Sequence, residues 1–118
     1  MYTLPRDFSP QSLTMKLLVE VCCNANQIRF VFDLQTKIVL EGRCQLRKVD
    51  AQTPIAIEPP LSEVSVLQLI GCGVVDATVD QTRSNLILSF SSGDTLTFIG
   101  EDPYECYLVT IEGKEFRV

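Results

Sequence analysis

The chain has 118 residues and a formal net charge of −5, and it contains neither histidine nor tryptophan. Without histidine it has no imidazole base, no Ser-His or Cys-His nucleophile pair and no zinc site that depends on histidine. The acidic balance argues against nucleic acid or an anionic membrane surface as a partner, because phosphate binding depends on Lys and Arg.

The first half of the chain has the pattern of a β-meander. Val, Ile and Thr number 12, 8 and 9 against 4 Ala, and this balance favours strands over helices. After an irregular stretch to residue 15, a compact apolar run predicts a strand over residues 16–23, and polar residues 24–26 predict a turn. Alternation of apolar and polar residues predicts strands over residues 28–32 and 38–46, the second one bent or bulged at Gly42.

The middle of the chain contains the one good helix candidate. Residues 51–60 hold three prolines and are typical of a connection. Residues 61–70 predict a short α-helix that is capped at Gly71, with an apolar stripe made of Leu61, Val64, Leu67 or Leu69, and Ile70. Strands follow over residues 74–79, 86–90, 96–98, 104–111 and 115–118, and residues 91–94 are the strongest turn signal.

A weak internal repeat relates the two halves. A shift of 58 residues places residues 28–32 on 86–90 and residues 38–42 on 96–100 without a gap. Two unrelated meanders with similar loops can also align in this way, which is the alternative. The pattern predicts one mainly β domain over residues 1–118, with antiparallel meanders at about 16–46 and 74–104 and a linker and short α-helix at about 51–71. The meanders should pack as a sandwich or as a partly open barrel, because each one alone buries its apolar face poorly.

Few residues are candidates for chemistry. Tyr104 and Glu105 follow a turn and are the residues that we single out for a possible interaction with a partner. No second carboxylate is well placed to share acid–base work with Glu105, so we expect no catalytic residue and no enzyme. The five cysteines are an odd number without C-x₂₋₄-C spacing, and no Gly-rich phosphate loop occurs. We therefore expect no metal or cofactor and, since no export signal is visible, reduced thiols in the cytoplasm.

Residues 86–105 read LILSFSSGDTLTFIGEDPYE. This segment resembles an uncharacterised family of small bacterial β-rich proteins, and residues 28–46 are similar to the first half of that family. The most specific points of the resemblance are Phe90, Gly93, Leu96, Tyr104 and Glu105. The resemblance implies a fold and no activity. Some small proteins of this type resemble immunity factors that accompany bacterial toxins, which implies a toxin-like protein as one candidate partner.

Three classes of function stay open at this point. The first is a small non-enzymatic protein-interaction module, supported by the missing catalytic side chains and by the acidic second half of the chain. The second is a small-ligand-binding β-barrel, whose cavity would have to be lined by Phe30, Phe32, Phe90 and Phe98. The third is an enzyme that uses carboxylates alone, for which the sequence offers no constellation.

The predicted strand over residues 16–23 is a poorly protected sheet edge. Only Lys16 and Glu20 interrupt its apolar run, and an unprotected edge presents unpaired backbone groups to other chains. We therefore expect a homodimer that forms through this strand, with Val19 and Val21 as contact residues. The alternative is a closed monomer. No apolar run is long enough to span a membrane.

Overall fold

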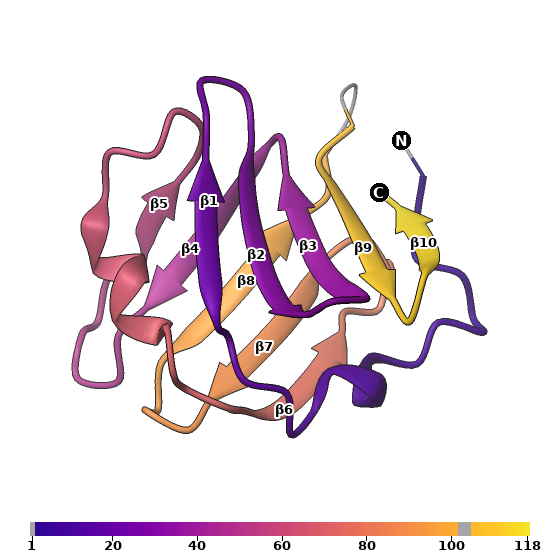
Figure 1. Ribbon diagram of the computed structural model, residues 1–118, viewed down its shortest axis with the longest axis horizontal. Coiled ribbons are helices and arrows are strands. Elements are labelled where there is room, and N and C mark those ends of the chain that lie inside the picture. Colours follow the sequence, from indigo (N-terminus) through magenta and orange to yellow (C-terminus); the bar gives the residue numbers. More distant parts are fainter. Residues whose placement is uncertain (1, 102–104) are drawn as a thin grey trace.

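The computed structural model describes residues 2–101 and 105–118, and in them it has ten β-strands and two short 3₁₀ helices. All strand pairs are antiparallel, and they form two five-stranded sheets, one in front of the other in Figure 1. The mainly β fold class predicted from composition and alternation is confirmed.

Each sheet combines three consecutive strands from one half of the chain with two strands from the other half. The first sheet consists, in spatial order, of β1 (Glu20–Cys23), β2 (Ile28–Asp33), β3 (Thr36–Leu40), β9 (Tyr107–Ile111) and β10 (Lys114–Arg117). The second sheet consists of β5 (Ile55–Ile57), β4 (Arg43–Arg47), β8 (Thr95–Ile99), β7 (Leu86–Phe90) and β6 (Val74–Val79). Both sheets are open, so the strands do not close into a barrel, and the two layers fit a β-sandwich.

The core lies between the two sheets. Buried and more exposed residues alternate along β2, β3, β7 and β8, as expected for strands with one face on a core. Phe30 of the first sheet and Phe98 of the second meet edge to face, with their ring centroids 5.3 Å apart. Such aromatic contacts between the layers stabilise their packing beyond the area that they bury.

The predicted strand over residues 38–46 is wrong, because the chain changes sheets in the middle of it. β3 ends at Leu40 in the first sheet and β4 begins at Arg43 in the second. The N–H groups of Glu41 and Gly42 both donate to the carbonyl of Cys106, at 2.9 and 2.8 Å. A Cβ on Gly42 would lie 3.2 Å from the Cα of Cys106. Glycine therefore marks a close backbone approach at a corner between the sheets rather than a bulge.

The predicted α-helix over residues 61–70 is also wrong. The segment forms the 3₁₀ helix η2 (Val64–Leu69), and it buries Val66 and Leu69. Leu69 was one alternative for the predicted stripe, but Val64 and Leu67 of that stripe face outward. Residues three apart share a face in a 3₁₀ helix, which has three residues per turn. The β-branched Val64 and Val66 lower the α-helix propensity of so short a segment. Gly71 does follow the helix with φ +91, as its predicted role in a cap requires.

Two other element boundaries differ from the prediction. β5 lies inside the proline-containing stretch that was expected to be a plain connection. β1 is shorter than the predicted strand, because the preceding residues 15–18 pair with residues 72–74 through an isolated bridge between Leu17 and Gly73 and through flanking backbone hydrogen bonds. The first 3₁₀ helix, η1 (Pro10–Leu13), packs beside β6 at the opposite side of the molecule from η2 (Figure 1).

Candidate functional site

Of the two residues singled out from the sequence, Tyr104 lies outside the described residues and Glu105 is exposed at the end of the first sheet. The Oε2 atom of Glu105 pairs with Nη1 of Arg117 at 2.9 Å, and both side chains are about half exposed. An ion pair so open to water contributes about 0–1 kcal/mol to stability. Glu105 also lines a shallow groove of about 500 Å³ together with Tyr2, Thr3, Pro5, Glu115, Phe116 and Arg117.

The four phenylalanines that a ligand-binding barrel would need around a cavity are all buried in the core. Phe30, Phe32, Phe90 and Phe98 belong to one hydrophobic cluster with their neighbours from both sheets. Phe98 also contacts the ring of Tyr107, at a centroid distance of 5.8 Å. These side chains fill the space between the layers, and the larger hollows formed by the described residues are open grooves on the surface. The requirement of a phenylalanine-lined cavity is not met.

The five cysteines all lie within the described residues, and they form no disulfide. Burial raises the pKa of the Cys44 thiol to about 12, so it is a structural thiol in the core. Cys22 and Cys23 on β1 are the accessible adjacent pair. The Cys22 thiol donates to Oε1 of Glu20 at 2.8 Å, and this hydrogen bond to a carboxylate raises the pKa of Cys22. Among the described residues, no three side chains of metal-binding type gather in one place.

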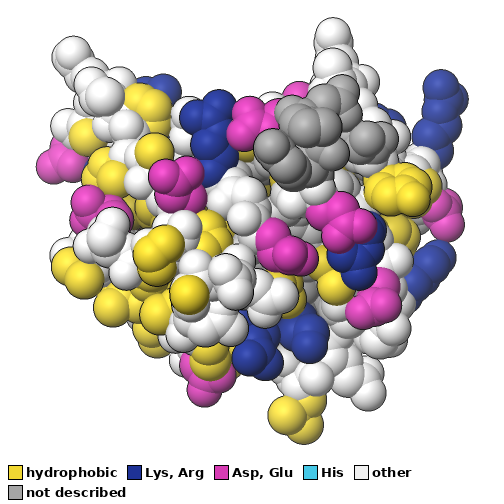
Figure 2. Space-filling model, turned by 90° about the horizontal axis from the view of Figure 1, so that it is seen from above, with side chains coloured by type: hydrophobic (Ala, Val, Ile, Leu, Met, Phe, Trp, Pro, Cys, Tyr) yellow, Lys and Arg dark blue, Asp and Glu magenta, His cyan; other side chains and the backbone are white. Residues whose placement is uncertain are grey.

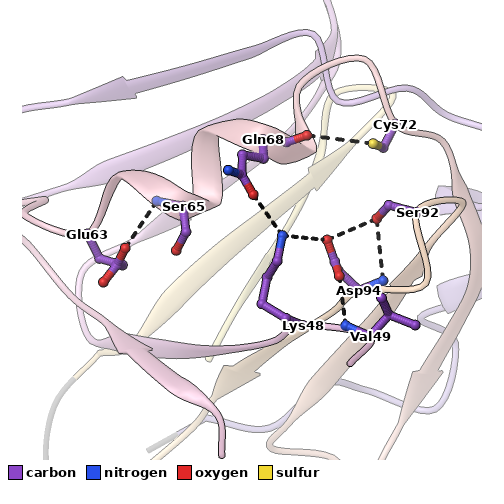
Figure 3. Close-up of polar contacts among 8 residues, drawn as sticks. All are labelled: Lys48, Val49, Glu63, Ser65, Gln68, Cys72, Ser92 and Asp94. Atoms are coloured by element: carbon purple, nitrogen blue, oxygen red, sulfur yellow. Dashed lines mark hydrogen bonds and ion pairs between the residues drawn. The ribbon is translucent and has the colours of Figure 1, made fainter. Parts of the chain in front are cut away.

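Asp94 anchors a polar network that sequence reasoning treated only as a turn (Figure 3). Asp94 is 4% exposed, and its side chain accepts from the N–H of Val49 at 2.9 Å, from Lys48 Nζ at 3.2 Å and from the Ser92 hydroxyl at 3.1 Å. Lys48 also donates to Oε1 of Gln68 in η2, at 2.8 Å. Burial opposes ionisation of Asp94 most strongly, but the hydrogen bonds together outweigh it and lower the pKa. The network ties the β7–β8 turn to the end of β4 and to η2, which is a structural role.

A group of exposed apolar side chains lies beside β1. Met15, Leu17 and Val19 form what we call the apolar ridge, and they are 92%, 52% and 52% exposed. Leu18 between them is buried, so the chain presents alternate apolar side chains outward. The ridge borders an open groove of about 590 Å³, lined by Val19, Glu20, Arg29, Val31, Phe32, Asp33, Leu34 and Lys37. Hydrophobic side chains also gather on the side of the molecule where η2 and β1 lie (Figure 2).

The four edges of the two sheets are covered to different degrees. Beside β10, the ring of Phe8 meets that of Phe116 edge to face, with ring centroids 4.9 Å apart. Beside β6, the side-chain amide of Gln11 in η1 donates to the carbonyl of Ala77 at 3.0 Å. β5 has only three residues. Covering an edge and shortening it are both ways in which proteins avoid unwanted pairing.

Among residues 2–101 and 105–118, β1 lacks such a cover. In the described part of the chain, no hydrogen bond from a segment outside the β1–β2 hairpin reaches the backbone of Val21 or Cys23. We call the stretch from Glu20 to Asn24 the open edge. The open edge and the apolar ridge lie next to each other in the chain, and together they form the candidate interaction site. The sequence signal that found them was the scarcity of charge over residues 16–23.

Comparisons with protein-family models, with curated proteins and with solved structures find no match to this chain. Within the described residues, no helix is both long enough and apolar enough to cross a membrane.

Proposed function

We propose that this protein is a small non-enzymatic interaction module that associates through the open edge of β1 and the adjoining apolar ridge. The observation that carries the proposal is the exposure of Met15, Leu17 and Val19 directly beside an uncovered strand edge. Large apolar side chains grouped on a surface are typical of protein–protein contacts, and unpaired strand edges favour β-pairing with another chain.

The partner that we propose is a second copy of the chain. In the internal repeat that we infer, β1 corresponds to β6 and each is the outer strand of its sheet. The N-terminal segment covers β6 through Gln11 and η1, whereas none of the described residues covers β1 in a comparable way. Covering the β1 edge with the same edge of a second copy leaves no uncovered long edge, and such isologous contacts close into two-fold dimers.

Association can be tested with ridge variants in sedimentation equilibrium. The wild type should show a mass near twice the 13.2 kDa of one chain. Leu17→Lys and Val19→Lys should each raise the dissociation constant at least about tenfold, because a charged ammonium group would have to be desolvated in the contact. Both side chains are half exposed in the single chain, so folding should survive, as a thermal melt can verify.

The matched control is Thr78→Lys, on the exposed face of β6 at the other sheet's edge, which should leave the association unchanged. Val21→Lys is unsuitable although the sequence suggested Val21 as a contact, because Val21 packs against the hydrophobic core. A wild-type mass of one chain at all concentrations would refute the proposed dimer, and so would a ridge variant that dimerises as tightly as the control.

A further inference from the structure

We propose that β1 pairs antiparallel with β1 of a second copy in a single register, with Cys22 facing Cys22 across the two-fold axis. This inference rests on the proposed function and adds to it the register and the residue at the centre of the contact. It follows from the limits of the open edge, from the direction of its backbone groups and from the side chains that this register brings together.

Hydrogen bonds within the chain limit the open edge at both ends. Before Glu20, both backbone groups of Leu18 already have partners within the chain. Its N–H donates to the carbonyl of Cys72 at 3.0 Å, and its carbonyl accepts from the N–H of Gly71 at 2.7 Å. After Cys23, the chain turns back: the N–H of Asn24 donates to the carbonyl of Gln27 at 3.0 Å. A second strand can therefore pair only along residues 20–24, and an antiparallel pairing of this stretch with itself is centred on residue 22.

The backbone N–H and C=O groups that a second strand needs for pairing lie on the outer side of β1. In the register of the hairpin, Cys22 pairs with Arg29 and Glu20 pairs with Val31. The hydrogen bond from Asn24 to Gln27 shows that the even-numbered residues point their backbone groups toward β2. In an antiparallel ladder the direction alternates, so the N–H and C=O groups of Val21 and Cys23 point away from the sheet. In the proposed register Val21 faces Cys23 of the second copy, and the two pairs exchange four backbone hydrogen bonds.

The side chains of the open edge are compatible with this register. Glu20 is the one charged residue among residues 20–24, and the register places it opposite Asn24 of the second copy. The side-chain oxygen of Asn24 already accepts from the N–H groups of Asn26 and Gln27, at 2.8 and 2.9 Å. Its NH₂ group remains to donate to the facing carboxylate. Val19 directly precedes the open edge, so the apolar ridge begins where the paired stretch ends.

Cys22 occupies the position between the two hydrogen-bonded pairs. Residues opposite each other in such a non-hydrogen-bonded pair have Cα atoms about 4.5 Å apart. A disulfide requires a Cα separation of roughly 4.4–6.8 Å. The two Cys22 thiols are thus within bonding reach in the dimer, whereas Cys23 side chains project from the other face of the strand.

Oxidative cross-linking of the full chain tests this register. Diamide, an azo oxidant, takes two electrons and two protons from a pair of thiols and becomes a hydrazine, while one S–S bond forms between the sulfur atoms. The reaction is run at about pH 9, where more of the thiol is ionised. Wild type and Cys23→Ser should give a disulfide-linked dimer on non-reducing electrophoresis, and Cys22→Ser should lose it. Cys23→Ser is the matched control because it changes the adjacent thiol.

Sedimentation of the same three proteins under reducing conditions separates the two proposals. If all three are dimers and only Cys22→Ser loses the cross-link, the register is supported. If they are dimers but the cross-link persists in Cys22→Ser or depends on Cys23, the register is overturned and the proposed function stands. If wild type is a monomer under reducing conditions, the proposed function fails and the register fails with it.

Discussion

The Asp94 side chain joins the β7–β8 turn to the segment that follows β4. Its carboxylate accepts from Val49, Lys48 and Ser92, and Lys48 extends the contact to η2 (Figure 3). Sequence reasoning recognised residues 91–94 as a strong turn but could not find this role, because Lys48 and Asp94 lie 46 positions apart. A buried carboxylate with several donors is stabilised in its ionised form, and removing it leaves those donors unpaired.

Asp94→Asn should therefore lower the free energy of unfolding by about 1.5–3 kcal/mol at neutral pH. The pKa of Asp94 is lower in the folded chain than its ordinary value of 3.8, so ionisation favours folding. That contribution is complete above the unfolded-state pKa and disappears as the pH falls through the lower folded-state value. Urea unfolding of wild type and variant should show their difference shrinking below about pH 4. A difference that stays constant down to pH 2, roughly, would contradict the ionic role.

Asp33→Asn provides the comparison at an exposed position. Asp33 pairs with Lys16 at 2.6 Å, but its side chain is about half exposed. Because water screens such a pair, its loss should cost less than about 1 kcal/mol. If Asp33→Asn lowers the free energy of unfolding as much as Asp94→Asn does, burial does not determine how strongly each carboxylate stabilises the fold.

At the scale of elements, period-2 alternation was sufficient to find most strands, and it failed where the chain turns a corner. The apolar positions on both sides of Gly42 continue one alternation, so the sequence could not show that they belong to different sheets. In η2, the apolar positions at 61, 64, 67 and 70 fit a helix, but burial selects Val66 and Leu69 instead. Which face of so short a segment is buried depends on packing between η2 and the sheets, and local pattern carries no information about it.

Gly42→Ala tests the corner. A Cβ there would lie 3.2 Å from the backbone Cα of Cys106 and 3.3 Å from its Cβ, and the backbone of Cys106 cannot move aside easily. We expect a loss of about 1–3 kcal/mol in the free energy of unfolding, measured by urea denaturation. Gly73→Ala is the control, since its nearest contact is a side-chain atom of Leu17 at 3.4 Å, and its effect should be clearly smaller. Equal effects would show that the corner has room for a side chain.

Across the whole molecule, the sheet edges are covered unevenly. The N-terminal segment covers β10 and β6, β5 is short, and β1 stays open beside the apolar ridge. The sequence predicted the poorly protected strand from its low charge. It could not predict that Val21 would face the core while Val19 faces outward. Residues 19 and 20 both lie opposite Val31, and this disturbs the alternation of side chains along the strand. The N–H of Val19 donates to the carbonyl of Val31, which is also the register partner of Glu20. The 58-residue repeat remains a prediction with which the two strand orders agree.

Residue-resolved amide hydrogen exchange at several protein concentrations shows whether β1 is the strand through which two copies pair. Cys22 donates its N–H to β2 within the chain, so its protection should not depend on concentration. The N–H groups of Val21 and Cys23 point outward, and they should gain protection together as the concentration rises and a second copy covers the open edge. If Val21 and Cys23 exchange as fast as unprotected amides at concentrations where the protein is dimeric, β1 is not the strand through which two copies pair.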